Sequence, residues 1–330
     1  MKVENLKQKF FVIAVLLIIS AGLVHASVQD KGGVESPKAI AEKKATKVNI
    51  EQAAANKEKS VVEYKTEDVT FVADCDGTEQ KYVIMVPDTN NLDTQVHGLL
   101  IVLHGHGADR WQFVKGPWGQ IRAFRDVAME HEMIFVSPDY RATTSWMGPQ
   151  AEQDVLQIIT NLKKKYRIGK VFIGGGSMGG SSCLTFTAIH PKLIDGVCSL
   201  NGTVNHFEYQ NFQDAISTSF GGTKVEIPLE YKKRSAEYWP ERFTMPVGIT
   251  ASGKDTVVPP DSVLRLANVL KLMGRDVMVI YDEDFGHDTK YENARAVLEF
   301  VIQKAQEHEA TKKRLLTKLN SLGGKQSLKL

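Results

Sequence analysis

The sequence has few cysteines and almost no excess of charge. Its 330 residues include three cysteines, Cys75, Cys183 and Cys198, and no C-x-x-C pair, so the chain is not a disulfide scaffold. We expect these thiols to be free, with a single disulfide as the alternative. The formal net charge is +2, which gives no reason to expect a nucleic-acid partner.

Long hydrophobic runs are also missing, apart from one near the N-terminus. Three lysines precede an apolar run of 15 residues at 10–24, and small residues precede the bond after Ala26. This pattern predicts a secretory signal peptide at 1–26, cleaved after Ala26, and therefore a secreted or periplasmic protein. The run is shorter than the roughly 20 residues of a spanning helix. We expect no stable membrane anchor, and a retained signal anchor is the alternative.

Two flanking segments lack the residues needed for a packed core. Residues 27–58 are polar and lysine-rich without any aromatic side chain, which predicts a flexible or weakly helical linker. Residues 306–330 are basic and are interpreted as a solvated helical extension. The sequence has no internal repeat. The remaining residues, 59–305, are predicted to form a single globular domain.

Within that domain, apolar strand patterns alternate with amphipathic helix patterns, which predicts a mostly parallel sheet with helices on both faces. The first two strands are expected to form an antiparallel pair at one edge. The eight expected strands lie within 61–74, 81–87, 98–105, 133–140, 171–176, 196–202, 246–253 and 276–284. The expected helices lie near 119–131, 150–165, 177–190, 226–238, 259–273 and 289–305.

The stretch VFIGGGSMGGSS, residues 171–182, fits two different motifs. Read from Gly174 it matches G-x-G-x-x-G, a loop that binds dinucleotide phosphates. Read around Ser177 it matches G-x-S-x-G, a turn that presents a nucleophilic serine. A dinucleotide site needs an acid at the end of the next strand, but Asp195 precedes that strand. The serine interpretation is therefore preferred.

A nucleophilic serine needs a histidine to accept its proton and an acid to orient the histidine. Asp255 follows the expected strand at 246–253, and His287 follows the strand at 276–284, so the chain order is serine, acid, histidine. Asp282, Glu283 and Asp284 are alternative acids. For Ser177 itself, the structural alternative is a hydroxyl that caps the following helix.

These motifs resemble the α/β-hydrolase family, in its esterase-like branch related to the prolyl oligopeptidase catalytic domain. The resemblance covers about residues 60–305 and implies an α/β-hydrolase fold with a mostly parallel eight-stranded sheet. It also implies that the acid follows the earlier strand, which favours Asp255. The matching stretches are LHGHGAD (103–109), DYRATTSWMGP (139–149), GGSMGGS (175–181), GKDTVVPP (253–260) and GHD (286–288).

An acyl-transfer enzyme also needs donors for the oxyanion of its intermediate. We expect these donors to be the backbone N–H groups of Met178 and His106. His104 and His106 could instead be metal ligands, but no third ligand follows at a supporting spacing, so neither a metal nor a cofactor is expected. In the loop after the strand at 133–140, Trp146, Tyr140 and Arg141 are guessed to contact substrate.

The sequence thus predicts a secreted serine hydrolase that cleaves carboxylic esters through an acyl-enzyme. An acetyl or hydroxycinnamoyl (feruloyl) ester, either a small molecule or on an oligosaccharide, is the expected substrate. A serine peptidase of the prolyl oligopeptidase type is the alternative, although only a short polar segment precedes the domain where those relatives usually carry a β-propeller. A non-catalytic binding module is a weaker alternative. The sequence gives no oligomeric state.

Overall fold

The computed structural model describes residues 62–89, 92 and 94–323. The predicted signal peptide at 1–26 and linker at 27–58 lie outside them. The chain divides into Met1–Ser60 and Val61–Leu330, and all described residues belong to the second unit. Among the described helices, none is long and apolar enough to cross a membrane.

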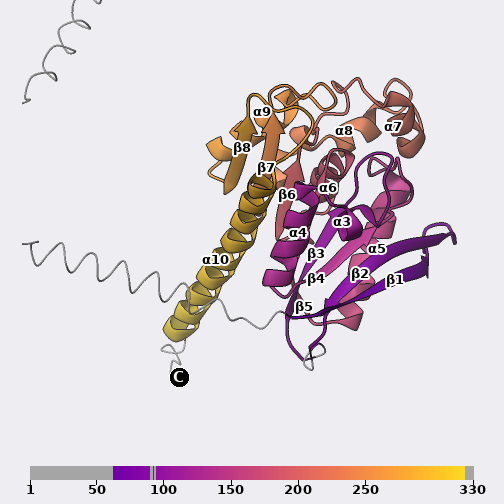
Figure 1. Cartoon of the computed structure of the whole chain (residues 1–330). Coiled ribbons are helices and arrows are strands. Elements are labelled where there is room, and N and C mark those ends of the chain that lie inside the picture. Colours follow the sequence, from indigo (N-terminus) through magenta and orange to yellow (C-terminus); the bar gives the residue numbers. More distant parts are fainter. Residues whose placement is uncertain (1–61, 90–91, 93, 324–330) are drawn as a thin grey trace, which may run out of the picture. The chain divides into compact units, whose positions relative to one another are not determined.

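Eight strands form one sheet in the order β1-β2-β4-β3-β5-β6-β7-β8 (Figure 1). β1 pairs antiparallel with β2, β2 pairs antiparallel with β4, and the remaining pairs are parallel. The predicted sheet and its antiparallel edge are confirmed. The strands are β1 (Tyr64–Val72), β2 (Glu79–Pro87), β3 (His97–Leu103), β4 (Ile134–Pro138), β5 (Ile168–Gly176), β6 (Gly196–Leu200), β7 (Val247–Ser252) and β8 (Val277–Asp282).

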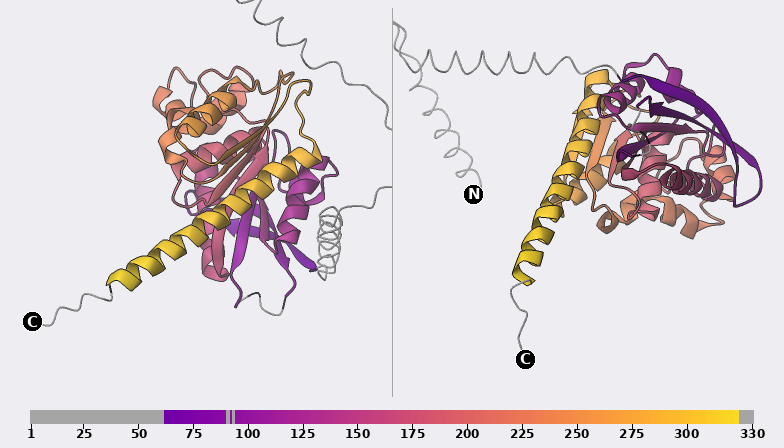
Figure 2. Two further views of the ribbon diagram at one scale, coloured as in Figure 1. Left: turned by 90° about the vertical axis from the view of Figure 1, so that its left-hand side faces the viewer. Right: turned by 90° about the horizontal axis from the view of Figure 1, so that it is seen from below.

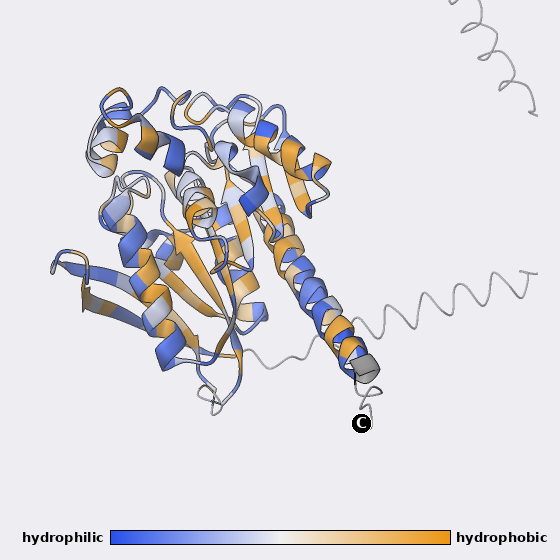
Figure 3. Cartoon of the chain, turned by 180° about the vertical axis from the view of Figure 1, so that it is seen from behind, coloured by the Kyte–Doolittle hydropathy of each residue, from blue (hydrophilic) through white to orange (hydrophobic). Residues whose placement is uncertain are grey.

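Two separate cores cover the two faces of the sheet, because side chains alternate along each strand. In β3, Leu99 and Ile101 join one core, while Leu100 and Val102 join the other. α5 (Pro149–Lys165), α6 (Met178–Ile189) and α9 (Asp261–Leu272) cover the first core. α4 (Gly119–Glu130) and α10 (Tyr291–Gly323) cover the second. Figure 3 shows the central strands as the most hydrophobic part of the sheet. The prediction of helices on both faces is confirmed.

Two expected helices end at other residues than predicted. The helix expected at 226–238 ends early, as α8 (Pro228–Arg234), because Ser235 leaves the helical region with a ψ of 101°. A 3-10 turn, Ala236–Tyr238, follows. The helix expected at 289–305 instead continues as α10 through Gly323. Figure 2 shows its C-terminal part projecting beyond the sheet.

Two more helices lie in the described part of the chain, one between β6 and β7 and one after β3. The insert at 203–225 contains α7 (Gln213–Phe220), which the sequence did not predict. A short α3 (Gln112–Lys115) follows β3. All three cysteines are free, with Cys75 exposed and the other two buried. At the carboxyl ends of the parallel strands, the loops after β3, β5, β7 and β8 come together.

Candidate active site

Ser177 stands on a sharp turn between β5 and α6. Its φ of 58° and ψ of −119° are disfavoured for a residue with a side chain, and such strain often marks a functional position. The motif glycines are explained by close packing here. A Cβ at Gly179 would lie 1.9 Å from the backbone oxygen of Leu103. The glycine-rich stretch therefore lets α6 approach β3 and lifts Ser177 to the end of the sheet.

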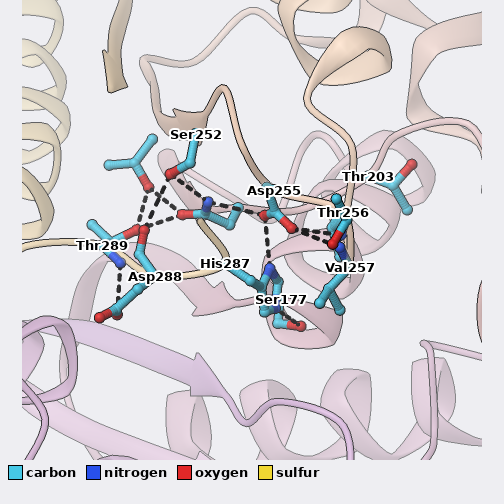
Figure 4. Close-up of polar contacts among 12 residues, drawn as sticks. Ser177, Thr203, Ser252, Asp255, Thr256, Val257, His287, Asp288 and Thr289 are labelled. Atoms are coloured by element: carbon cyan, nitrogen blue, oxygen red, sulfur yellow. Dashed lines mark hydrogen bonds and ion pairs between the residues drawn. The ribbon is translucent and has the colours of Figure 1, made fainter. Parts of the chain in front are cut away.

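Three side chains from three loops form one hydrogen-bonded chain (Figure 4). Nε2 of His287 lies 2.8 Å from Oγ of Ser177, and Nδ1 of His287 lies 2.7 Å from Oδ2 of Asp255. Ser177 is 110 residues before His287 in the sequence, so the fold alone creates this contact. The arrangement lets His287 take a proton from the serine while Asp255 fixes the ring.

Asp255 is held as an anion in a buried position. Burial by itself would raise the pKa of this carboxyl, but the hydrogen bond from His287 and the backbone N–H of Val258 outweigh burial, so the pKa lies below its usual value. Oδ1 accepts from the N–H groups of Val257 and Val258, at 3.0 and 2.8 Å. Oδ2 accepts from Nδ2 of Asn201 at 3.2 Å. A carboxylate with this many donors stays charged beside the histidine.

Two of the three alternative acids form ion pairs with lysines. Asp282 forms an ion pair with Lys290 at 2.6 Å, and Asp284 forms one with Lys254 at 2.7 Å. The structure therefore brings Asp255, and neither of these two carboxylates, against His287.

The two residues predicted to supply oxyanion donors lie near Ser177 in the chain or in the cavity that it lines. Met178 begins α6 directly after the serine, and His106 lies in the loop after β3. Within the described part of the chain, neither N–H donates a hydrogen bond to another group. The N–H of Gly105 is instead occupied by Oε1 of Gln112 at 2.8 Å.

A cavity of about 250 Å³ opens onto the serine. Ser177, His287 and His106 form its reactive side. The other walls mix amide and hydroxyl groups with apolar side chains, and Asp288 is the single carboxylate among them. These walls are Gly105, Gln112, Phe113, Gln120, Ile121, Gly176, Leu200, Asn201, Asp288 and Thr289.

The three residues guessed to contact substrate do not line this cavity. Arg141 forms ion pairs with Asp76 and Asp154, both at 2.7 Å. Tyr140 is buried and donates from its hydroxyl to the backbone oxygen of His104 at 2.6 Å. Trp146 is 1% exposed, behind His106. Their contact with substrate stays a prediction, and the structure places Tyr140 and Trp146 as buried side chains outside the cavity lining.

Within the residues that the structure describes, no group that could hold a metal ion includes His104 or His106. His104 is fully buried in its loop, with its ring 4.6 Å from that of Tyr140 between centroids. Among residues 62–89, 92 and 94–323, no group of three or more histidine, cysteine or acidic side chains could hold a metal ion.

Sequence analysis missed Asn201, which lies at the centre of the network behind the acid. Besides Asp255, its amide donates to Oγ of Ser252 at 2.9 Å, and its Oδ1 accepts from Thr289 and Thr250. Asn201 has a φ of 49°, a conformation that asparagine tolerates better than most residues. Its place directly after a buried strand was the available signal.

Comparisons with known proteins agree with this geometry. Residues 139–308 match the model of the prolyl oligopeptidase family, which is more than half of the chain. The chain belongs to the prolyl oligopeptidase family. No curated protein sequence matches the chain.

Solved structures with the same fold include both peptidase-like and esterase enzymes. A puromycin hydrolase aligns with a TM-score of 0.59 and 16% identity, over 74% of this chain and 39% of that one. An S-formylglutathione hydrolase from Staphylococcus aureus aligns with a TM-score of 0.55 and 15% identity, over 72% and 99%. A ferulic acid esterase aligns with a TM-score of 0.55 and 15% identity, over 73% of this chain and 98% of that one.

The chain thus spans about two fifths of the puromycin hydrolase but nearly the full length of the two esterases. At these identities the likeness establishes the α/β-hydrolase fold. The chain is therefore a member of the prolyl oligopeptidase family with the α/β-hydrolase fold.

Proposed function

We propose that the protein cleaves carboxylic esters, with Ser177, His287 and Asp255 as its catalytic triad. The observation that carries this proposal is the continuous hydrogen-bonded chain from Oγ of Ser177 through His287 to a buried carboxylate. A serine with no base beside it is a weak nucleophile, and a histidine without an orienting acid is a poor base. Here each partner lies within hydrogen-bond distance of the next.

In the proposed reaction, Oγ of Ser177 attacks the ester carbonyl and its proton passes to Nε2 of His287. The carbonyl oxygen, now an anion, accepts hydrogen bonds from the N–H groups of His106 and Met178. His287 then gives its proton to the leaving alcohol, which leaves an acyl group on Ser177. Water repeats the cycle, releasing the acid and restoring the serine.

The cavity supports a small, uncharged acyl group. Its volume of about 250 Å³ is below the roughly 300–1,000 Å³ of sites for drug-sized ligands. An acetyl group fits this space more readily than a hydroxycinnamoyl group. The amide side chains of Gln112 and Gln120 on the wall are suited to the hydroxyl groups of a sugar alcohol. We therefore propose an acetylated carbohydrate or similar small ester as substrate, without metal or cofactor.

A peptidase is the second candidate, because the cavity wall includes an exposed carboxylate. Asp288 follows His287 directly and could receive the amine of a peptide N-terminus. Its Oδ1 accepts from the backbone N–H of Thr289 at 2.7 Å, which leaves Oδ2 available. An Asp288→Asn variant would lose cleavage of aminoacyl anilides and keep ester turnover if this interpretation holds.

Turnover on a panel of esters and anilides tests the proposal. Acetyl and feruloyl esters, acetylated xylan oligosaccharides and aminoacyl anilides would be assayed with wild type and Ser177→Ala. We expect acetyl esters to be cleaved fastest and the variant to lose that activity. Full ester turnover by Ser177→Ala would contradict the mechanism, and dominant anilide cleavage would favour the peptidase.

Export from the cytoplasm is a separate proposal that rests on the N-terminal sequence. Sequencing the N-terminus of the protein purified from the medium or periplasm would test it, and a mature chain that begins at Ser27 is expected. A chain that keeps its first residues and stays in the cytoplasm would refute it.

A further inference from the structure

The oxyanion loop, residues 104–107, is held from outside by a second loop. This clamp loop, residues 139–148, contacts it at three positions. The hydroxyl of Tyr140 donates to the backbone oxygen of His104 at 2.6 Å. Nε1 of Trp146 donates to Nδ1 of His106 at 3.1 Å, and the N–H of Gly107 donates to the backbone oxygen of Thr143 at 2.8 Å.

The hydrogen bond from Trp146 to His106 matters most, because it holds the residue whose N–H is proposed to bind the oxyanion. His106 lies between Gly105 and Gly107, and Gly107 has a φ of 81°. Glycines on both sides leave the backbone easy to rotate. The His106 N–H itself donates no hydrogen bond within the described residues. The carbonyl of Gly105, which belongs to the same peptide group, accepts from the N–H of Ala108 at 3.1 Å and lies 2.9 Å from Nδ1 of His104. Those contacts lie within the loop and its immediate neighbour Ala108, whereas the side chain of His106 connects this peptide group to the clamp loop through Trp146.

That side chain is fixed in position and in tautomer. An indole N–H can only donate, so Nδ1 of His106 must be unprotonated and the ring proton must sit on Nε2. Phe212 from the insert covers the ring, with centroids 4.3 Å apart. Trp146 is itself buried and packs on Tyr209 at 5.5 Å. Burial also lowers the pKa of His106, which is consistent with a neutral ring.

The clamp loop is strained and is held in place by buried charge. Four of its residues have positive φ without being glycine: Tyr140, Arg141, Trp146 and Met147. Such conformations persist only where surrounding contacts impose them. Arg234 is fully buried; its Nη1 donates to the backbone oxygen of Met147 at 2.6 Å, and its Nη2 pairs with Oε2 of Glu152 at 2.8 Å. Ser219 of the insert also bonds to the loop at Ser145 and Gly148.

We propose that Trp146 is a positioning residue, which aims the His106 amide at the oxyanion by holding the His106 side chain. The proposal rests on the proposed function of the Ser177 site. Trp146 touches neither the serine nor the cavity, so it acts only through His106. Its loss should slow the chemical step and leave substrate binding almost unchanged, since the oxyanion forms only in the transition state.

The test compares four variants with the wild type. Trp146→Phe removes the indole donor and keeps an aromatic ring, and Trp239→Phe is the matched control, because its indole donates to Lys232 far from the site. His106→Leu removes the acceptor, while His106→Asn keeps an acceptor where Nδ1 lies. If Trp146→Phe does not fold, the two His106 variants still test the proposal. Because His106 is only partly buried, we expect both variants to fold.

Three quantities are measured for each protein: kcat and KM on an acetyl ester, and the rate at which a fluorophosphonate labels Ser177. The label needs no matching acyl pocket. Oγ bonds to phosphorus, the P–F bond breaks, fluoride leaves and the serine proton passes to His287. The developing charge on the phosphoryl oxygen needs the same donors. The thermal midpoint of unfolding is recorded for every variant.

We expect Trp146→Phe and His106→Leu to lower kcat and the labelling rate about tenfold to hundredfold, with KM within about twofold. His106→Asn should recover most of the loss relative to His106→Leu. The inference is overturned if Trp146→Phe labels and turns over like Trp239→Phe, or if KM alone changes. A wild type that the label does not modify at Ser177 would refute the proposed function itself.

Discussion

The two sides of Ser177 are built in different ways. On one side, Asp255 belongs to a compact polar network in which the Asn201 side chain bonds to this carboxylate and to hydroxyl groups from β7 and from the loop after β8. On the other side, the oxyanion loop depends on a strained neighbouring loop and on aromatic packing from the insert. The first side sets the charge of a side chain, while the second sets the direction of a backbone amide.

This difference predicts different failures. Removing a group on the acid side should change both protonation and stability, because buried polar groups lose their partners. Removing a side chain that contacts the oxyanion loop should leave the triad's hydrogen bonds intact and reduce only transition-state stabilisation, whereas the buried Arg234–Glu152 pair that holds the clamp loop contributes to fold stability. The four changes below test that contrast, from the largest effect to the smallest.

Asp255→Asn should lower kcat by about 10⁴-fold, since an asparagine amide would favour the wrong tautomer of His287. Asp284→Asn is the matched control, because Asp284 is exposed, lies close by and pairs only with Lys254. Steady-state kinetics on an acetyl ester would decide. If Asp255→Asn stayed within tenfold of wild type, another group would have to orient His287.

Glu152→Gln should destabilise the fold by about 2–3 kcal/mol, because it removes the more buried of the two carboxylates, Glu152 and Glu230, that pair with the buried guanidinium of Arg234. Urea unfolding measures this. Glu309→Gln, in the exposed pairs with Lys170 and Lys313, should cost less than about 1 kcal/mol. Equal losses of stability in both variants would show that burial does not decide how much an ion pair contributes to stability.

The same carboxyl should give a pH signature. Although burial opposes it, hydrogen bonds from His190 and Arg234 lower the pKa of Glu152 to about 2. A lowered pKa means that the contribution to stability is complete above the unfolded value near 4.5 and is lost as the pH falls towards 2. Wild type should therefore lose more stability than Glu152→Gln between pH 5 and pH 2. Parallel curves would contradict this assignment.

Asn201→Ala should cost about 1–3 kcal/mol of stability and lower kcat about tenfold, because Asp255 loses a donor and nearby hydroxyls lose their acceptor. Asn205→Ala removes a comparably buried amide that binds Glu237 at 2.8 Å. It should lower stability without lowering kcat. A kcat loss in both variants would mean that general loosening, and not the acid network, controls the rate.

Phe212→Ala should have the smallest effect, a loss of less than tenfold in kcat, which corresponds to about 1 kcal/mol of transition-state stabilisation. The variant removes packing on His106 and leaves the Trp146 hydrogen bond. Val225→Ala, an exposed position on the same insert, should change nothing measurable. A kcat loss larger than that of Trp146→Phe would move the positioning role from the tryptophan to the insert.

Sequence patterns predicted the sheet because buried parallel strands are continuous apolar runs, as at 98–105. They also pointed to Ser177, Asp255 and His287, since each follows such a run and parallel strands end at one edge of the sheet. These three side chains indeed meet.

The contacts that hold the site's loops in place could not be predicted from sequence patterns. The Arg234–Glu152 pair joins residues 82 apart, and the positive φ of Trp146 and Met147 is imposed by tertiary contacts that no local pattern records. Trp146 was guessed to line the pocket because its loop faces the right edge of the sheet. Its side chain instead turns beneath the surface to reach His106.

The central claim is that Ser177 carries the acyl group. The most direct measurement is peptide mass mapping after rapid acid quench of wild type with an activated acetyl ester. We predict an acetyl group on the peptide that contains Ser177, which is absent in Ser177→Ala and accumulates in a variant with slow deacylation. Turnover with no adduct on that peptide, or an unchanged adduct elsewhere in Ser177→Ala, would contradict the account.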